Sequence, residues 1–213
     1  MKLLAFETTD KTASVALLSE EGLFVRYAPD NLRHAESVLP TAEALLQEFG
    51  MSTADMDAFA VDAGPGSFTG VRIGVCMANG LAAWHEKPVV AVNALETLAR
   101  PYLAEERPIL ALIEARNGNG YAAIYAGERT LLEPCACVKE EVLAQLPVGG
   151  ICLGSGSPNP ENVILPDAGD VAMLVAQRLA LSGFPASGYH GEKEVTPLYL
   201  RPSQAERLWE ERE

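Results

Sequence analysis

The segment from Gly64 to Gly70 has residue types that could form a binding turn for an anion. A turn rich in glycine and proline follows an apolar run, and a helix is expected to begin at Thr69. Backbone N–H groups at a helix start favour negatively charged ligands. The segment lacks the lysine of a P-loop, and its glycine spacing is one residue longer than that of a dinucleotide fingerprint. A tight turn without a ligand explains the same residues.

The N-terminal segment Glu7-Thr8-Thr9-Asp10 offers hydroxyl and carboxylate oxygens of the kind that suit a phosphate–magnesium group. Thr8, Thr9 and Asp10 are therefore candidate contacts for a nucleotide or another anion, together with Gly66 and Ser67 of the glycine turn. Threonine and aspartate are also ordinary turn-forming residues. The sequence leaves both interpretations open.

Small residues recur every four positions in the helix expected after the glycine turn, at Gly70, Gly74, Ala78 and Ala82. Such residues lie along one side of a helix. Glycine in a helix costs about 1 kcal/mol relative to alanine, so close packing should offset that cost. The element that approaches this side belongs either to the same domain or to another chain, and the spacing does not distinguish the two.

The histidines and cysteines do not form a recognisable catalytic or metal-binding set. The three histidines are not spaced four residues apart, and the four cysteines contain no Cys-x-x-Cys pair. His34 stands alone near the start of a predicted helix, where a capping or surface role is more common than metal binding. Cys76 falls in the middle of a predicted helix rather than at its start, and no Ser-His-Asp set can be assigned.

Composition and charge limit the classes of function that the chain can have. The chain has 213 residues, of which 48% are hydrophobic and 21% charged, as is typical of globular proteins. Its net charge of −13 opposes strong binding to nucleic acid, since that binding depends on neutralising phosphates. No apolar segment reaches the roughly 20 residues of a membrane-spanning helix, and no secretory signal is evident. We therefore expect a cytoplasmic protein that contacts nucleic acid only through a partner.

The hydrophobic pattern predicts an α/β chain of two lobes. In the first half, strands are expected at 2–7, 13–18, 23–27, 58–63 and 87–92, and helices at 35–49, 70–85 and 94–103. In the second half, strands are expected at 109–115, 121–126, 130–133 and 150–153, and helices at 139–146 and 168–181. We assign an N-terminal lobe to 1–105, a shorter C-terminal lobe to 106–201 and a helical tail to 202–213.

Several of these segments resemble the TsaB (YeaZ) family. The string Gly64-Pro65-Gly66-Ser67-Phe68-Thr69-Gly70-Val71-Arg72-Ile73-Gly74 is similar to that family's N-terminal lobe, as is Glu7-Thr8-Thr9. The segments 114–121 and 197–201 are similar to its later motifs, although Glu114 and Asn119 replace an aspartate and a glutamate. The resemblance implies the actin/Hsp70/sugar-kinase (ASKHA) fold. It also implies an accessory role in bacterial synthesis of threonylcarbamoyladenosine (t6A) in tRNA.

The resemblance further implies that the chain is not itself catalytic. The related transferase family, TsaD, has a metal-binding His-x-x-x-His, and Ala94 and Leu98 stand at the matching positions here. Neither side chain can ligate a metal ion. We therefore expect a subunit that requires no cofactor of its own, with any nucleotide bound at the interface between subunits.

The expected partners are a TsaD-type catalytic subunit and a TsaE-type ATPase, and the isolated chain could form a homodimer through the same surface. The predicted contacts lie on the helices at 35–49 and 70–85: His34, Val38, Ala42, Leu45, Gly70, Gly74, Met77, Ala78 and Leu81. On this hypothesis, Gly74→Leu would block association. The alternative is an ATP-dependent small kinase or hydrolase of the same fold, in which Glu7, Thr9 and Asp10 hold phosphate and magnesium.

Overall fold

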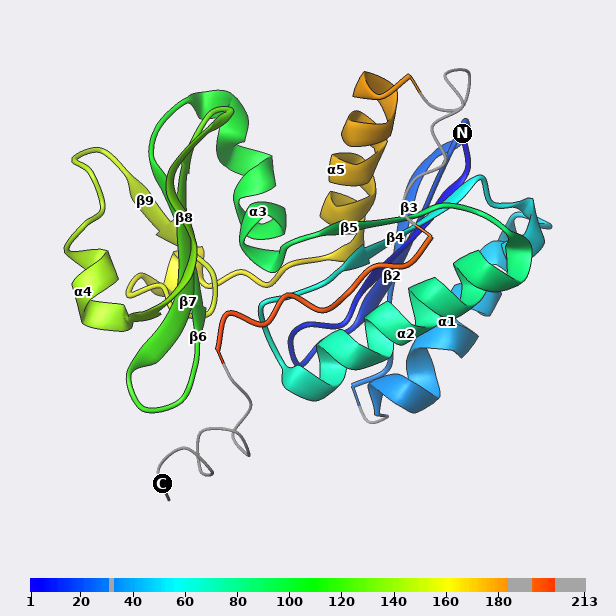
Figure 1. The fold of residues 1–213 in the computed structure, drawn as a ribbon, viewed down its shortest axis with the longest axis horizontal. Coiled ribbons are helices and arrows are strands. Elements are labelled where there is room, and N and C mark those ends of the chain that lie inside the picture. Colours follow the sequence, from blue (N-terminus) through cyan, green and yellow to red (C-terminus); the bar gives the residue numbers. More distant parts are fainter. Residues whose placement is uncertain (31–32, 184–192, 202–213) are drawn as a thin grey trace.

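Two mixed β-sheets stand side by side, and each has helices on both faces (Figure 1). The computed structural model describes residues 1–30, 33–183 and 193–201. The first sheet has the order β3-β2-β1-β4-β5 and the second has the order β8-β7-β6-β9. The strands of the first sheet are β1 (Leu3–Glu7), β2 (Ser14–Ser19), β3 (Gly22–Tyr27), β4 (Ala58–Asp62) and β5 (Val89–Val92). Those of the second are β6 (Ile109–Glu114), β7 (Asn119–Ala126), β8 (Arg129–Val138) and β9 (Ile151–Leu153).

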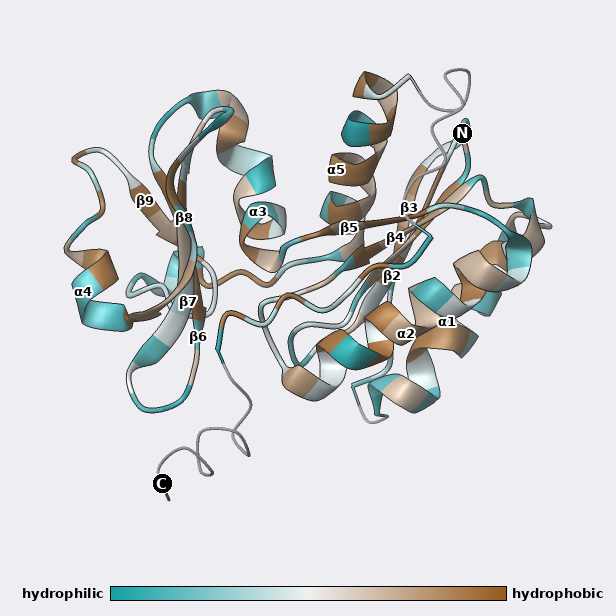
Figure 2. Cartoon of the chain, in the orientation of Figure 1, coloured by the Kyte–Doolittle hydropathy of each residue, from teal (hydrophilic) through white to brown (hydrophobic). Residues whose placement is uncertain are grey.

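Helices α1 (His34–Glu48) and α2 (Phe68–His85) cover one face of the first sheet, and α5 (Ala168–Leu181) covers the other. Successive side chains of a strand point to opposite faces. Leu4 and Phe6 of β1 accordingly pack toward α1 and α2, whereas Leu3 and Ala5 pack toward α5. The strands therefore need apolar residues at nearly every position, and they are largely hydrophobic in Figure 2.

The second sheet has α3 (Ala94–Ala99) on one face and α4 (Lys139–Leu143) on the other. The strands predicted at 109–115 and 121–126 form a hairpin as β6 and β7, and Asn117 and Gly118 adopt positive φ angles of 60° and 71° in the turn between them. The helix predicted at 94–103 instead divides into α3 and a 3-10 helix, Arg100–Glu105. Pro101 has no N–H to continue the α-helical hydrogen bonding, which explains the division.

The order of elements is as predicted, but two helices pack on the sheet of the opposite half. Helix α3 packs against β6 and β7, and α5 packs against β1 and β2. The two helices also meet each other, and Arg178 of α5 forms an ion pair with Glu96 of α3. The boundary predicted at residue 105 therefore divides the chain along the sequence, but the packing of α3 and α5 crosses it. The tail predicted at 202–213 lies outside the described residues.

Membrane insertion through a helix has no support within the described ranges. None of the helices there combines the length and the apolar character that a membrane crossing requires.

Candidate functional site

The glycine turn joins β4 to α2 and packs against the segment that follows β1. The Ser67 N–H donates to the Thr9 carbonyl oxygen at 2.6 Å, and Ser67 Oγ caps α2 by accepting from the Gly70 N–H at 3.3 Å. Thr8 Oγ1 donates to the Gly70 carbonyl oxygen at 2.8 Å. Thr9 donates from its backbone N–H and its hydroxyl to Glu7 Oε1, at 2.5 and 2.7 Å. The polar groups of the two segments therefore bond to each other.

The five predicted anion contacts are brought together by this packing but do not present a shared open site. Thr8 and Thr9 are buried, Gly66 and Asp10 are half-buried, and Ser67 is exposed. A Cβ atom at Gly66 would lie 2.4 Å from the Thr9 carbonyl oxygen. Glycine is therefore required at this position by the chain's own backbone, without any ligand.

The row of small residues along α2 also faces inward. A Cβ atom at Gly70 would lie 2.0 Å from the Thr8 carbonyl oxygen, and one at Gly74 would lie 2.4 Å from Thr8 Oγ1. Ala78 is fully buried on the same side of the helix. The prediction that Gly70, Gly74 and Ala78 contact a partner is wrong, because the N-terminal turn and the first sheet already cover them.

Three further predicted partner contacts are wrong for the same reason. They lie in the core between α1 and the first sheet: Val38, Ala42 and Leu45. The other three are half-buried rather than open. His34 places Nε2 2.8 Å from the Asp10 carbonyl oxygen, and Met77 and Leu81 pack against the edge of the same core.

A different row of α2 reaches the surface. It consists of Phe68, Thr69, Arg72, Cys76, Gly80, Ala83 and Trp84. Trp84 is 82% exposed, and a Cβ atom at Gly80 would have nothing within 4 Å. Arg72 is the one charged residue in this row. Few charged residues together with exposed aromatic side chains are typical of the centre of a protein interface. Helix α1 on the same face of the sheet exposes Leu39.

A pair of buried carboxyl groups lies beneath the glycine turn. Glu7 ends β1 and Asp62 ends the neighbouring parallel strand β4, and both are 0% exposed. Asp62 accepts from the Gly64 N–H at 2.9 Å and from the Thr97 hydroxyl at 3.0 Å. Glu7 Oε2 is buried without a donor in the described part of the chain, unless Asp62 carries a proton and donates it.

The electrostatic surroundings favour that shared proton. Burial raises the pKa of Glu7, and the hydrogen bond from Asp62 opposes this rise. Burial together with the Glu7 carboxylate raises the pKa of Asp62 well above its usual range. We therefore expect the two carboxyl groups to share one proton in the folded chain. We expected a role for Glu7 only in the alternative of a phosphate-using enzyme, and Asp62 was not among the predicted residues.

The second-lobe motif is also engaged within the chain. Glu114 pairs with Lys139 at 3.5 Å, and its N–H donates to Ser155 Oγ at 3.0 Å. Asn119 accepts a hydrogen bond from Arg201 at 2.8 Å. The two residues that depart from the family pattern therefore hold neighbouring segments in place.

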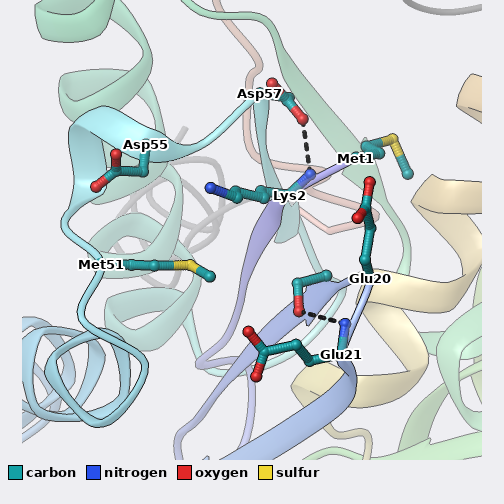
Figure 3. A pocket seen from close by; sticks show the side chains of 8 residues that line it. Met1, Lys2, Glu20, Glu21, Met51, Asp55 and Asp57 are labelled. Atoms are coloured by element: carbon teal, nitrogen blue, oxygen red, sulfur yellow. Dashed lines mark hydrogen bonds between the residues drawn. The ribbon is translucent and has the colours of Figure 1, made fainter.

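A separate pocket of about 360 Å³ lies beside the start of β1, at the turn between β2 and β3 (Figure 3). The Lys2 N–H donates to Asp57 within it at 2.7 Å. Its lining is Met1, Lys2, Ser19, Glu20, Glu21, Met51, Asp55 and Asp57. None of the predicted site residues lines this pocket.

Ala94 is the first residue of α3, and Leu98 lies one turn further along the helix. Their exposed fractions are 0% and 1%. Their apolar side chains pack between α3 and the second sheet. In the described ranges no group of three or more histidine, cysteine, aspartate or glutamate side chains could hold a metal ion.

Comparison with known proteins identifies the family. The tRNA threonylcarbamoyladenosine biosynthesis protein TsaB of Escherichia coli K12 is 31% identical to this chain over 96% of each sequence. The chain belongs to the TsaB family. A solved structure of YeaZ from Pseudomonas aeruginosa superposes with a TM-score of 0.74 at 33% identity, over 93% of this chain and 99% of that one. The ASKHA fold predicted from the sequence is confirmed.

Part of this TsaB-family chain is also similar to the catalytic family. Residues 30–154 match the family model of TsaD, tRNA N6-adenosine threonylcarbamoyltransferase. The transferase of Erythrobacter litoralis is 46% identical over 63 residues, which are 30% of this chain and 18% of the transferase. The residues that match the transferase family model begin before His34 and end after β9, so they include α1 and α2.

Proposed function

We propose that this chain is a non-catalytic subunit of the t6A synthesis machinery, which binds a TsaD-type transferase and keeps it active. The observation that carries the proposal is the similarity to a tRNA threonylcarbamoyladenosine biosynthesis protein over 96% of the chain. The similarity of residues 30–154 to the transferase family supports pairing, because two chains with the same helices can associate about a pseudo-twofold axis.

The residues at the expected metal-binding positions support the non-catalytic role. Ala94 and Leu98 have no ligand atoms, and both are buried against the second sheet. The proposal accordingly needs no cofactor held by this chain, and it places any nucleotide at the boundary between subunits. The TsaE-type ATPase, indirect contact with tRNA, a homodimer of the free chain and a cytoplasmic location are further parts of the proposal.

The exposed row of α2, together with α1, is the face that we assign to the transferase. Cys76, Gly80 and Ala83 are small enough to let a partner helix approach closely, and Trp84 offers a large apolar surface. Aromatic side chains of this kind often dominate binding energy at an interface. This face replaces the buried residues that the sequence suggested.

Substituting Gly80 with arginine tests this face. The Cβ position is open and arginine is a better helix former than glycine, so Gly80→Arg should be at least as stable to heat as wild type but should not co-elute with the transferase on gel filtration. Ala180→Arg is the matched control, because Ala180 is exposed on α5 and lies on the opposite side of the first sheet. Co-elution of the Gly80→Arg protein at the wild-type ratio would contradict the assignment.

The alternative of an ATP-using kinase or hydrolase is not favoured by the geometry. Thr8, Thr9 and Ser67 use their polar groups inside the chain, so few remain for phosphate. We expect negligible hydrolysis when Mg-ATP is added to the purified protein. Turnover that disappears in an Asp10→Asn variant would instead support the enzyme.

A further inference from the structure

The segment 193–201, which we call the strap, runs along α2 and then reaches the second lobe (Figure 1). Val195 exchanges two hydrogen bonds with the Asn79 side chain of α2, at 2.8 and 3.0 Å. The Leu198 N–H donates to the Ala63 carbonyl oxygen at 2.8 Å, just before the glycine turn. The strap is therefore held beside α2 at Asn79 and just before the glycine turn at Ala63, so that Tyr199 follows close to the start of α2.

Tyr199 forms a cluster with two side chains at the start of α2. Its ring stacks on Phe68 with 5.0 Å between centroids, and the Arg72 guanidinium carbon lies 3.9 Å from the Phe68 centroid. Arg72 Nε also donates to the Tyr199 hydroxyl oxygen at 2.9 Å. Phe68 and Tyr199 remain 39% and 44% exposed, so the cluster is open to solvent.

The cluster retains unused hydrogen-bonding capacity. A guanidinium group has five N–H donors, and the hydrogen bond to Tyr199 is the one that Arg72 makes in the described ranges. A planar guanidinium held against aromatic rings is suited to bind a carboxylate through two parallel hydrogen bonds. The chain's net charge of −13 disfavours a nucleic-acid phosphate as the acceptor.

We propose that the Phe68–Arg72–Tyr199 cluster recognises a carboxylate side chain of the TsaD-type transferase, with Tyr199 positioning the Arg72 guanidinium. This inference rests on the proposed pairing of the two proteins. The cluster lies at the N-terminal end of the exposed row of α2, so a partner on Cys76 and Gly80 would also reach Arg72. The strap thereby becomes part of the binding face, although it is distant from α2 in the sequence.

Calorimetric titration of the transferase into the intact protein, at about 50 mM and about 500 mM salt, tests the cluster. Arg72→Met should weaken binding at least about tenfold at low salt, because a hydrogen bond to a charged group is lost. The deficit should shrink at high salt. Tyr199→Ala should weaken binding less than Arg72→Met, and Tyr199→Phe, which keeps the stacked ring, should restore part of the loss. Arg129→Met, which removes an exposed arginine of β8, is the control and should bind as wild type.

The outcomes separate this inference from the pairing itself. If wild type binds and Arg72→Met binds equally well at low salt, the cluster is not part of the interface. The inference also fails if the Arg72→Met deficit is independent of salt, or if that variant loses only affinity for tRNA in a gel-shift assay. If wild type itself does not bind the transferase, the proposed function fails and this inference fails with it.

Discussion

Replacing Gly70 with alanine is expected to lower the free energy of unfolding by about 3 kcal/mol, although alanine is the better helix former. The added Cβ atom would lie 2.0 Å from the Thr8 carbonyl oxygen, which is backbone and cannot rotate away. Either α2 or the segment after β1 must shift. The shift would also disturb the hydrogen bond from the Thr8 hydroxyl to the Gly70 carbonyl oxygen. Urea denaturation monitored by circular dichroism measures the change.

Gly80→Ala in the same helix is the matched control. Nothing lies within 4 Å of its Cβ position, so the variant should gain about 1 kcal/mol from helix propensity alone. Opposite signs for the two substitutions would establish that the small residues of α2 serve internal packing. A Gly70→Ala protein as stable as Gly80→Ala would contradict the packing described above. By the same geometry, Gly74→Leu should destabilise the fold itself.

In wild type, the free energy of unfolding should change with pH at values above the ordinary carboxyl pKa. The Asp62→Asn variant should lose this dependence. Because the pKa of Asp62 is raised in the folded state, the folded chain binds a proton that the unfolded chain has released. Stability therefore rises as pH falls from the raised pKa toward the ordinary one, by at most about 1.4 kcal/mol per pH unit. An asparagine amide donates to Glu7 at every pH, so the variant should lose this contribution.

Denaturation curves between about pH 5 and pH 8 test the shared proton. Asp170 also contributes, since burial and Asp167 raise its pKa to about 6, so the informative quantity is the difference between wild type and variant. That difference should favour Asp62→Asn increasingly as pH rises. Glu43→Gln, which removes an exposed carboxylate of α1, is the control and should parallel wild type. A parallel curve for Asp62→Asn would show that the pair does not share a proton.

The order and type of the main elements could be predicted from the sequence because the apolar residues follow regular periods. Helices expected at 35–49 and 70–85 occur as α1 and α2, and the Asn117–Gly118 turn is where glycine and asparagine favour positive φ angles. The docking of α5 on the first sheet could not be predicted, since an apolar helix face does not specify which sheet it covers. The strap has no hydrophobic period, and its path is set by its contacts with other segments, among them the hydrogen bonds to Asn79 and Ala63.

The candidate site was harder to predict because the same residues suit the core and an interface. Val38 and Ala42 form the apolar side of α1, and that side packs on the chain's own sheet. The open side of α2 has no comparable pattern, since Cys76, Gly80 and Trp84 share only their exposure. The pairing of the two carboxyl groups could have been predicted from the sequence. Glu7 and Asp62 each end an apolar strand, and parallel pairing of those strands places their ends together.

The most direct test of the central claim is the amount of t6A that a purified TsaD-type transferase forms on tRNA as this protein is added. The assay also contains the TsaE-type ATPase, and all substrates of the reaction are in excess. We expect no product from this protein without the transferase, and a yield that rises until the two are equimolar. Gly80→Arg should abolish the rise, whereas Ala180→Arg should retain it. A yield that is the same with and without this protein would contradict the account.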